Sequence, residues 1–167
     1  MNIEKAVLKH SNMLYKICIV MLCNEQDTQD AVQDTFCRYL EKRPEFKSPE
    51  HEKAWLIRVA TNICRDMLRF QARHPKIAID DLSHRLAAPE QTEAFIELLE
   101  LPPKLKIVIY LHYVDGYNVK EIAGILKISE SAVKKRLQRG RMSLRTAWKE
   151  ANENNERNQS EKHNGSN

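Results

Sequence analysis

Donor-rich side chains are concentrated near the end of the chain, where residues 127–149 contain eight basic residues and one acidic residue. On one helical face of this stretch, Arg and Lys could bond the O6 and N7 atoms of guanine, Gln could pair with adenine, and the other groups could hold phosphates. We expect a surface that contacts DNA, although a solvated basic helix in an ordinary bundle would share this composition. The expected DNA contacts are Ser131, Lys134, Lys135, Gln138 and Arg139.

A helix-turn-helix is the element that would present this face to a major groove. Asn118 and Glu121 have the spacing of a capping box that starts a short helix, and Ser129 can cap a second helix. Val133 and Leu137 of the second helix would then point inward, which leaves the donor-rich positions outside. Two helices joined by a short turn, the second one basic, are typical of proteins that place a recognition helix in DNA.

Two further polar faces are predicted in the first half of the chain. Four side chains recur at spacings of three or four from residue 58 to residue 69, so they would share one face of a helix. They could follow a nucleic-acid backbone and read a base, or they could form ordinary solvated surface. A preceding helix carries an acidic and polar face that suits a basic protein partner. The first set is Arg58, Asn62, Arg65 and Arg69, and the second set is Asp30, Gln33 and Asp34.

Helical periodicity runs through most of the chain, and no stretch shows the sustained alternation of a strand. One helix would start at Ile3, a second would follow Asp27 as its N-cap, and a third would run from about Glu52 to Arg73. Between the two halves the periodicity is lost and prolines appear, which is typical of a linker. The prediction is an all-α protein with two small helical domains, 1–74 and 91–151, a flexible linker at 75–90 and a disordered tail at 152–167.

Composition argues against most enzymes and against a membrane protein. The four glycines are scattered, so no phosphate-binding or nucleophile loop is formed, and the six histidines show no metal-ligand spacing. The four cysteines include no C-x-x-C pair, and the longest apolar stretch, residues 17–23, is too short to span a bilayer. We expect a cytoplasmic protein with reduced thiols that has no cofactor, no metal, no small-molecule substrate and no catalytic residues.

Three motifs in series resemble a known family. They are the run DAVQDTF at 30–36, the run AWLIRVATN at 54–62 with Asp66 and Arg69 after it, and the helix-turn-helix preceded by Leu101-Pro102. In this order they resemble a bacterial RNA polymerase sigma factor of the extracytoplasmic-function (ECF) type, a group of the sigma-70 family. The resemblance covers about residues 1–150.

The resemblance implies a function and a role for each predicted face. The acidic face at residues 30–34 would dock on the clamp helices of the polymerase β′ subunit. Loop 43–53 and the helix after it would open and read the minus-10 element on the non-template strand, with Arg58 and Asn62 as leading contacts. Helix 129–149 would read the minus-35 element, and apolar surface near it would seat the β flap. An anti-sigma factor is a further candidate partner.

One alternative stays open at this point, a free-standing helix-turn-helix transcriptional regulator whose first domain senses a signal or dimerises. Such a regulator would not need the acidic face or the Arg-Asn face of the first domain. A sigma factor would instead work by physical selection, with no covalent chemistry. Binding energy from two DNA-reading modules, both fixed to core polymerase, would add through effective concentration and drive local melting of the promoter.

Overall fold

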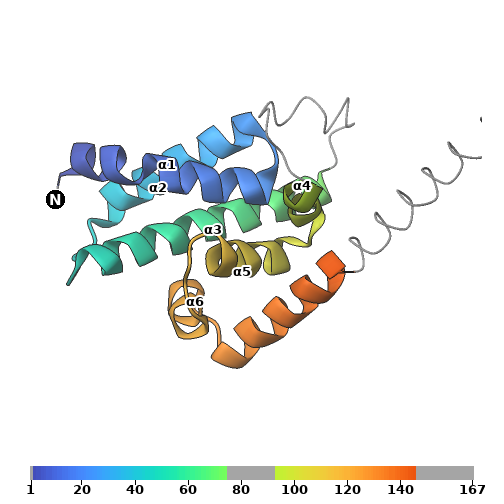
Figure 1. Ribbon diagram of the computed structural model, residues 1–167. Helices are drawn as coiled ribbons and strands as arrows, with labels where there is room; N and C mark the ends of the chain where they lie inside the picture. Colours follow the sequence, from blue (N-terminus) through green and yellow to red (C-terminus); the bar gives the residue numbers. More distant parts are fainter. Residues whose placement is uncertain (1, 75–92, 146–167) are drawn as a thin grey trace, which may run out of the picture.

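The computed structural model describes residues 2–74 and 93–145, and the regular elements within these ranges are all helices (Figure 1). The first three are α1 (Ile3–Leu22), α2 (Glu25–Lys42) and α3 (Pro49–Arg73). They are followed by α4 (Glu93–Glu100), α5 (Pro103–Tyr113), α6 (Val119–Leu126) and a helical stretch at 130–145. The predicted all-α fold is confirmed, whereas the predicted linker and disordered tail lie outside the described residues.

Local signals set the starts of the long helices, and two of the predicted starts are wrong. The N-cap of α2 is Asn24, whose side-chain oxygen accepts the backbone N–H of Asp27 at 2.8 Å, so Asp27 lies in the first turn. The N-cap of α3 is Ser48, and the helix begins at Pro49 because proline lacks an N–H that the first turn would leave unpaired. The loop before α3 is therefore 43–48, shorter than the predicted 43–53.

The first three helices run side by side and enclose the core of the N-terminal domain (Figure 1). Their inward stripes supply side chains with no exposed surface, among them Leu14, Ile17, Leu56 and Ile57. Burying a side chain of this size contributes about 1.5–3 kcal/mol, so this stripe, more than helix propensity, holds the polar faces of α2 and α3 in place.

The C-terminal domain contains the predicted helix-turn-helix. The capping box at the start of α6 is confirmed, with both the Asn118 and the Glu121 hydrogen bonds formed at 2.8 Å. The turn passes through Lys127 at φ 56°, where many such turns have glycine, and this left-handed conformation costs a non-glycine residue about 1 kcal/mol. The 130–145 helix lies close against α5, since a Cβ on Gly140 would stand 2.7 Å from Cγ1 of Ile109.

The two domains contact each other, with α5 packed on α1 and α6 packed on α3. Lys106 of α5 is buried at this contact, and its ammonium donates to the carbonyls of Met21 and Leu99, both at 3.3 Å, and approaches Cys23 Sγ at 3.7 Å. The last turn of α1 has no basic residue of its own. Lys106 therefore supplies, from the other domain, the positive charge that a helix C-terminus favours.

Candidate nucleic-acid and polymerase interfaces

The recognition face is the exposed side of the 130–145 helix. The helix is capped by Ser129, whose Oγ accepts the backbone N–H of Ala132 at 3.0 Å. Val133 and Leu137 are 0% and 2% exposed, as the sequence predicts, and they hold the helix on its domain. The recognition face consists of Ser131, Lys134, Lys135, Gln138 and Arg139, all of which are exposed.

The arginine face of α3 (Arg58, Asn62, Arg65 and Arg69) is divided between solvent and the C-terminal domain. Arg65 and Arg69 are exposed, and Arg69 lies 4.0 Å from the Asp66 carboxylate. Arg58 and Asn62 are half-buried. The side chains of this face share one side of the helix, as their spacing predicts, but they do not all face open solvent.

A small hollow of about 70 Å³ lies where the arginine face meets the C-terminal domain. Asn62 and Arg65 line it from α3, while Lys104 of α5 and Arg136 of the 130–145 helix line it from the other side. Sequence reasoning missed Arg136, because its place between the recognition face and the buried stripe gives no signal of a contact with α3. Bringing several cations to one place makes this contact electrostatically unfavourable unless an anion enters.

The three side chains of the α2 face (Asp30, Gln33 and Asp34) are all exposed, as predicted. Local contacts hold this face only weakly, since the hydrogen bond from Gln26 Nε2 to Asp30 Oδ1 is exposed and long, at 3.3 Å. The opposite side of the same helix is buried through Ala31 and Thr35. The face is thus anchored by the core and presents two carboxylates and an amide to solvent.

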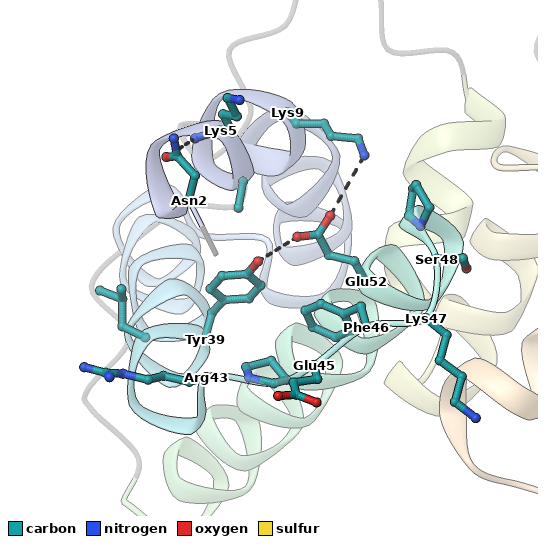
Figure 2. Close-up of a pocket in the computed structure, with 14 residues that line it drawn as sticks. Asn2, Lys5, Lys9, Tyr39, Arg43, Glu45, Phe46, Lys47, Ser48 and Glu52 are labelled. Carbon is teal, nitrogen blue, oxygen red and sulfur yellow. Dashed lines mark hydrogen bonds and ion pairs between the residues drawn. The ribbon is translucent and has the colours of Figure 1, made fainter.

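The loop pocket is a hollow of about 1300 Å³ beside loop 43–48 (Figure 2). Aromatic walls come from Tyr39 and Phe46, and four basic side chains stand around it. These are Lys5, Lys9, Arg43 and Lys47. The arginine face does not line this pocket, so the loop and the arginine face, which the resemblance assigns together to the minus-10 element, are separate surfaces in this arrangement. Sequence reasoning also missed Lys5 and Lys9, whose spacing of four on α1 was the available signal.

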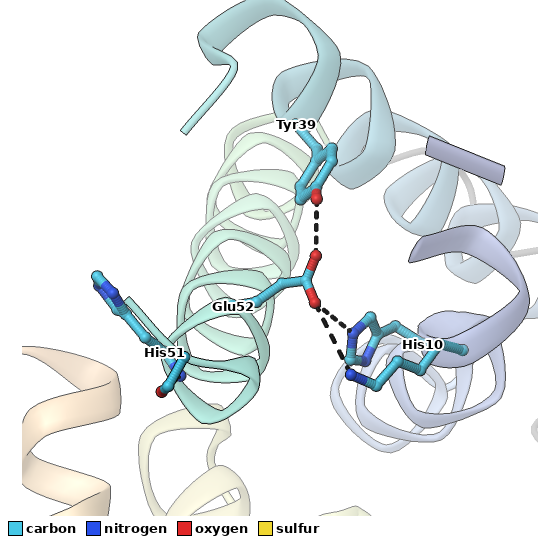
Figure 3. A network of polar contacts seen from close by, with 6 residues as sticks. His10, Tyr39, His51 and Glu52 are labelled. Carbon is cyan, nitrogen blue, oxygen red and sulfur yellow. Dashed lines mark hydrogen bonds and ion pairs between the residues drawn. The ribbon is translucent and has the colours of Figure 1, made fainter. Parts of the chain in front are cut away.

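Glu52 of α3 lines the loop pocket and binds side chains from α1 and α2 (Figure 3). Its Oε1 accepts the hydroxyl of Tyr39 at 2.7 Å, and its Oε2 is 3.2 Å from His10 Nε2 and 3.9 Å from Lys9 Nζ. Burial acts to raise the pKa of Glu52, but the hydrogen bonds from Tyr39 and His10 and the nearby charges outweigh burial and hold the pKa below its usual range. The carboxylate is therefore ionised at neutral pH.

Two known protein families match this chain, one in each half. The Sigma-70 region 2 family matches residues 6–74, and the Sigma-70, region 4 family matches residues 97–144. The chain belongs to the sigma-70 family. Its function is that of a sigma factor, which directs promoter-specific transcription, and a free-standing regulator is not favoured.

Curated relatives include ECF sigma factors, which places the chain in the ECF group of the family. The chain is 30% identical over 157 residues to SigW of Bacillus subtilis, with 81% of this chain and 83% of that protein covered. It is 27% identical over 154 residues to SigE of Mycolicibacterium smegmatis, with 85% of this chain but only 60% of that protein covered. Among residues 2–74 and 93–145, we find no helix long and apolar enough to cross a membrane.

Two solved structures share this fold. The sigma factor RpoE of Bartonella quintana, solved in complex with the anti-sigma factor NepR, matches with a TM-score of 0.69 and 21% identity, covering 87% of this chain and 96% of that chain. CnrH in complex with the cytosolic domain of CnrY matches with a TM-score of 0.64 and 27% identity, covering 88% of this chain and 87% of that chain. The first likeness shows the fold alone.

Proposed function

We propose that this sigma factor reads two promoter elements with two separate surfaces, and that the recognition face reads the minus-35 element. The observation that carries the proposal is the recognition face, where five exposed donor or acceptor side chains stand on the second helix of a helix-turn-helix held by Val133 and Leu137. Gln138 and Arg139 have the donors and acceptors to read base edges in the major groove. Lys134 and Lys135 suit phosphates, which fix the register of the helix.

The N-terminal domain, in this proposal, engages the minus-10 element as a single strand. The loop pocket offers aromatic walls and cations, which suit an unstacked base with its phosphate, and the arginine face, which lies outside the pocket, supplies positive charge along α3 for the rest of the strand. The α2 face docks on the β′ clamp helices of core polymerase, where two carboxylates would meet basic side chains. The β flap docks on the C-terminal domain.

Engagement of both elements requires the two domains to separate. The elements are about 25 base pairs apart, or roughly 85 Å at 3.4 Å per base pair, far more than a contact between α3 and the helix-turn-helix domain allows. We assign residues 1–74 and 91–151 to the two domains, 75–90 to their linker and 152–167 to a tail. The described contact between the domains would then be a closed state that core polymerase and promoter DNA replace.

Control of this closed state would come from an anti-sigma factor, a proposal supported by the match to a sigma factor solved with such a partner. The protein would act in the cytoplasm, without a cofactor and without catalytic residues of its own, because the nucleotidyl transfer belongs to core polymerase. Its contribution is binding energy that selects and melts the promoter.

Replacing Gln138 with alanine is expected to relax base preference at one position of the minus-35 element, because a bidentate base contact contributes about 1–3 kcal/mol of discrimination. Lys134→Ala is expected to reduce transcription from all promoters in the set to the same extent, since a phosphate contact carries no information about the base. The measurement is transcription by core polymerase from a promoter set with single-base changes. Ser143→Ala, exposed on the same helix outside the recognition face, is the control and should match the wild type. Unchanged base preference in Gln138→Ala would remove this residue from the reading surface.

A further inference from the structure

Two aromatic residues that line the loop pocket, Tyr39 and Phe46 (Figure 2), form one connected cluster with Trp55. The Tyr39 ring stacks on Phe46 of the loop, with centroids 5.8 Å apart and an interplanar angle of 23°. The Trp55 ring of α3 packs edge-on against both rings, with a centroid distance of 5.9 Å to each. Because residues 43–48 form no regular secondary structure, the position of Phe46 depends on this packing.

Tyr39 is the member of the cluster that a hydrogen bond fixes. Its side chain is almost fully buried, and its hydroxyl donates to Glu52 Oε1 at 2.7 Å. Burial raises the pKa of Tyr39 to about 12, with the bond to Glu52 and its charge adding to the effect, so the phenol remains a donor at neutral pH. A buried tyrosine hydroxyl needs such a partner, and the carboxylate on α3 provides it.

Glu52 also joins this cluster to the basic side of the pocket. Its other oxygen binds His10 Nε2 at 3.2 Å and lies 3.9 Å from Lys9 Nζ, and Lys9 itself lines the pocket (Figures 2 and 3). One carboxylate thus contacts α1 and α2 from α3 and holds both an aromatic wall and a cation of the pocket. Its charge is balanced by these donors, which lowers its repulsion of a nearby phosphate.

We propose that Glu52 is a positioning residue for the single-stranded minus-10 element, acting through Tyr39 to hold Phe46 as a preformed wall of the loop pocket. Glu52 does not itself contact the DNA in this arrangement. Holding the wall in place before binding reduces the ordering cost that a mobile loop would pay when a base enters. This inference rests on the proposed function, because it needs the loop pocket to receive the non-template strand.

Three variants separate positioning from general stability. Glu52→Met removes the acceptor for Tyr39, Tyr39→Phe removes the donor, and Glu52→Gln keeps a carbonyl oxygen that can still accept the hydroxyl. Glu50→Met is the matched control, because this glutamate is exposed on the same turn of α3 and loses the same charge. All are made in the full chain, and circular dichroism and thermal unfolding verify that each one folds.

The test uses a promoter that the wild-type protein and core polymerase select from randomised DNA, supplied as duplex and with its minus-10 region already melted. We expect Glu52→Met and Tyr39→Phe to reduce stable open complexes on duplex by roughly tenfold, the scale of one base-stacking contact, with the double variant no worse than either one. Glu52→Gln should recover most of the loss, and minus-35 preference should not change. If Glu52→Met does not fold, the inference is tested by Tyr39→Phe and Glu52→Gln alone.

Three outcomes separate a failure of this inference from a failure of the proposed function. If the wild type supports no promoter-specific initiation, the proposed function fails, whatever the variants do. If the wild type initiates and Tyr39→Phe matches both wild type and Glu50→Met on the two templates, Glu52 and Tyr39 do not position the pocket. An equal loss of stable open complexes in Glu52→Gln and Glu52→Met would also overturn the inference, because the hydrogen bond to Tyr39 would then be irrelevant.

Discussion

Replacing Lys106 with glutamate is expected to loosen the contact between the two domains and lower the stability of the chain. The change removes the donor for two largely buried carbonyls, at about 1–3 kcal/mol each, and places a carboxylate at the negative end of α1. We expect a loss of about 3–5 kcal/mol and a fall in the midpoint of thermal unfolding of roughly 10 °C. Circular dichroism during heating measures it.

The matched control for this prediction is Lys120→Glu, which makes the same charge change at an exposed position of α6. It should shift the midpoint by no more than about 2 °C, since a surface substitution typically changes stability by less than 0.5 kcal/mol. Small-angle X-ray scattering adds a second readout, because separated domains increase the radius of gyration. Identical midpoints and identical scattering for the Lys106 and Lys120 variants would show that Lys106 does not hold the domains together.

Charge reversal on the α2 face is expected to abolish most transcription without impairing DNA recognition. Asp34→Lys combined with Gln33→Lys would place cations where the proposed β′ contact needs carboxylates, and like charges in an interface cost several kcal/mol. We expect affinity for core polymerase to fall about a hundredfold or more. Binding of immobilised core polymerase measures this effect, and promoter-dependent transcripts should fall with it.

Glu100→Lys matches the charge change of Asp34→Lys at an exposed position of α4 and should leave core binding intact. The salt dependence of DNA binding provides the second comparison, because the slope of log affinity against log salt concentration reports the number of phosphate contacts. This slope should not differ between the α2-face variant and the wild type. Normal affinity of the double variant for core polymerase would show that the α2 face is not the docking surface.

The helix-turn-helix was the most predictable part of the fold because its signals are local. The capping box and the inward spacing of Val133 and Leu137 depend on residues within one or two turns, and burial follows directly from that spacing. Helix starts were less predictable. Asn24 and Asp27 are both good caps three residues apart, so only the surrounding packing selects Asn24.

The parts of the site that sequence reasoning missed depend on contacts distant in the chain. Lys106 stands in an apolar helix, and the carbonyl of Met21 that it binds is 85 residues away. Glu52 takes its partners from two other helices, at His10 and Tyr39. The partners of Lys106 and of Glu52 follow no periodicity or spacing that a single sequence could display. These contacts form only when the helices pack together.

The most direct test of the account is transcription from a library of randomised DNA by core polymerase, with and without this protein, followed by sequencing of the transcribed templates. We predict that two sequence elements at a fixed spacing are enriched only when both components are present, and that Gln33→Lys with Asp34→Lys removes the enrichment. Transcribed templates that are the same with core polymerase alone, or enrichment that persists in the α2-face variant, would contradict the account.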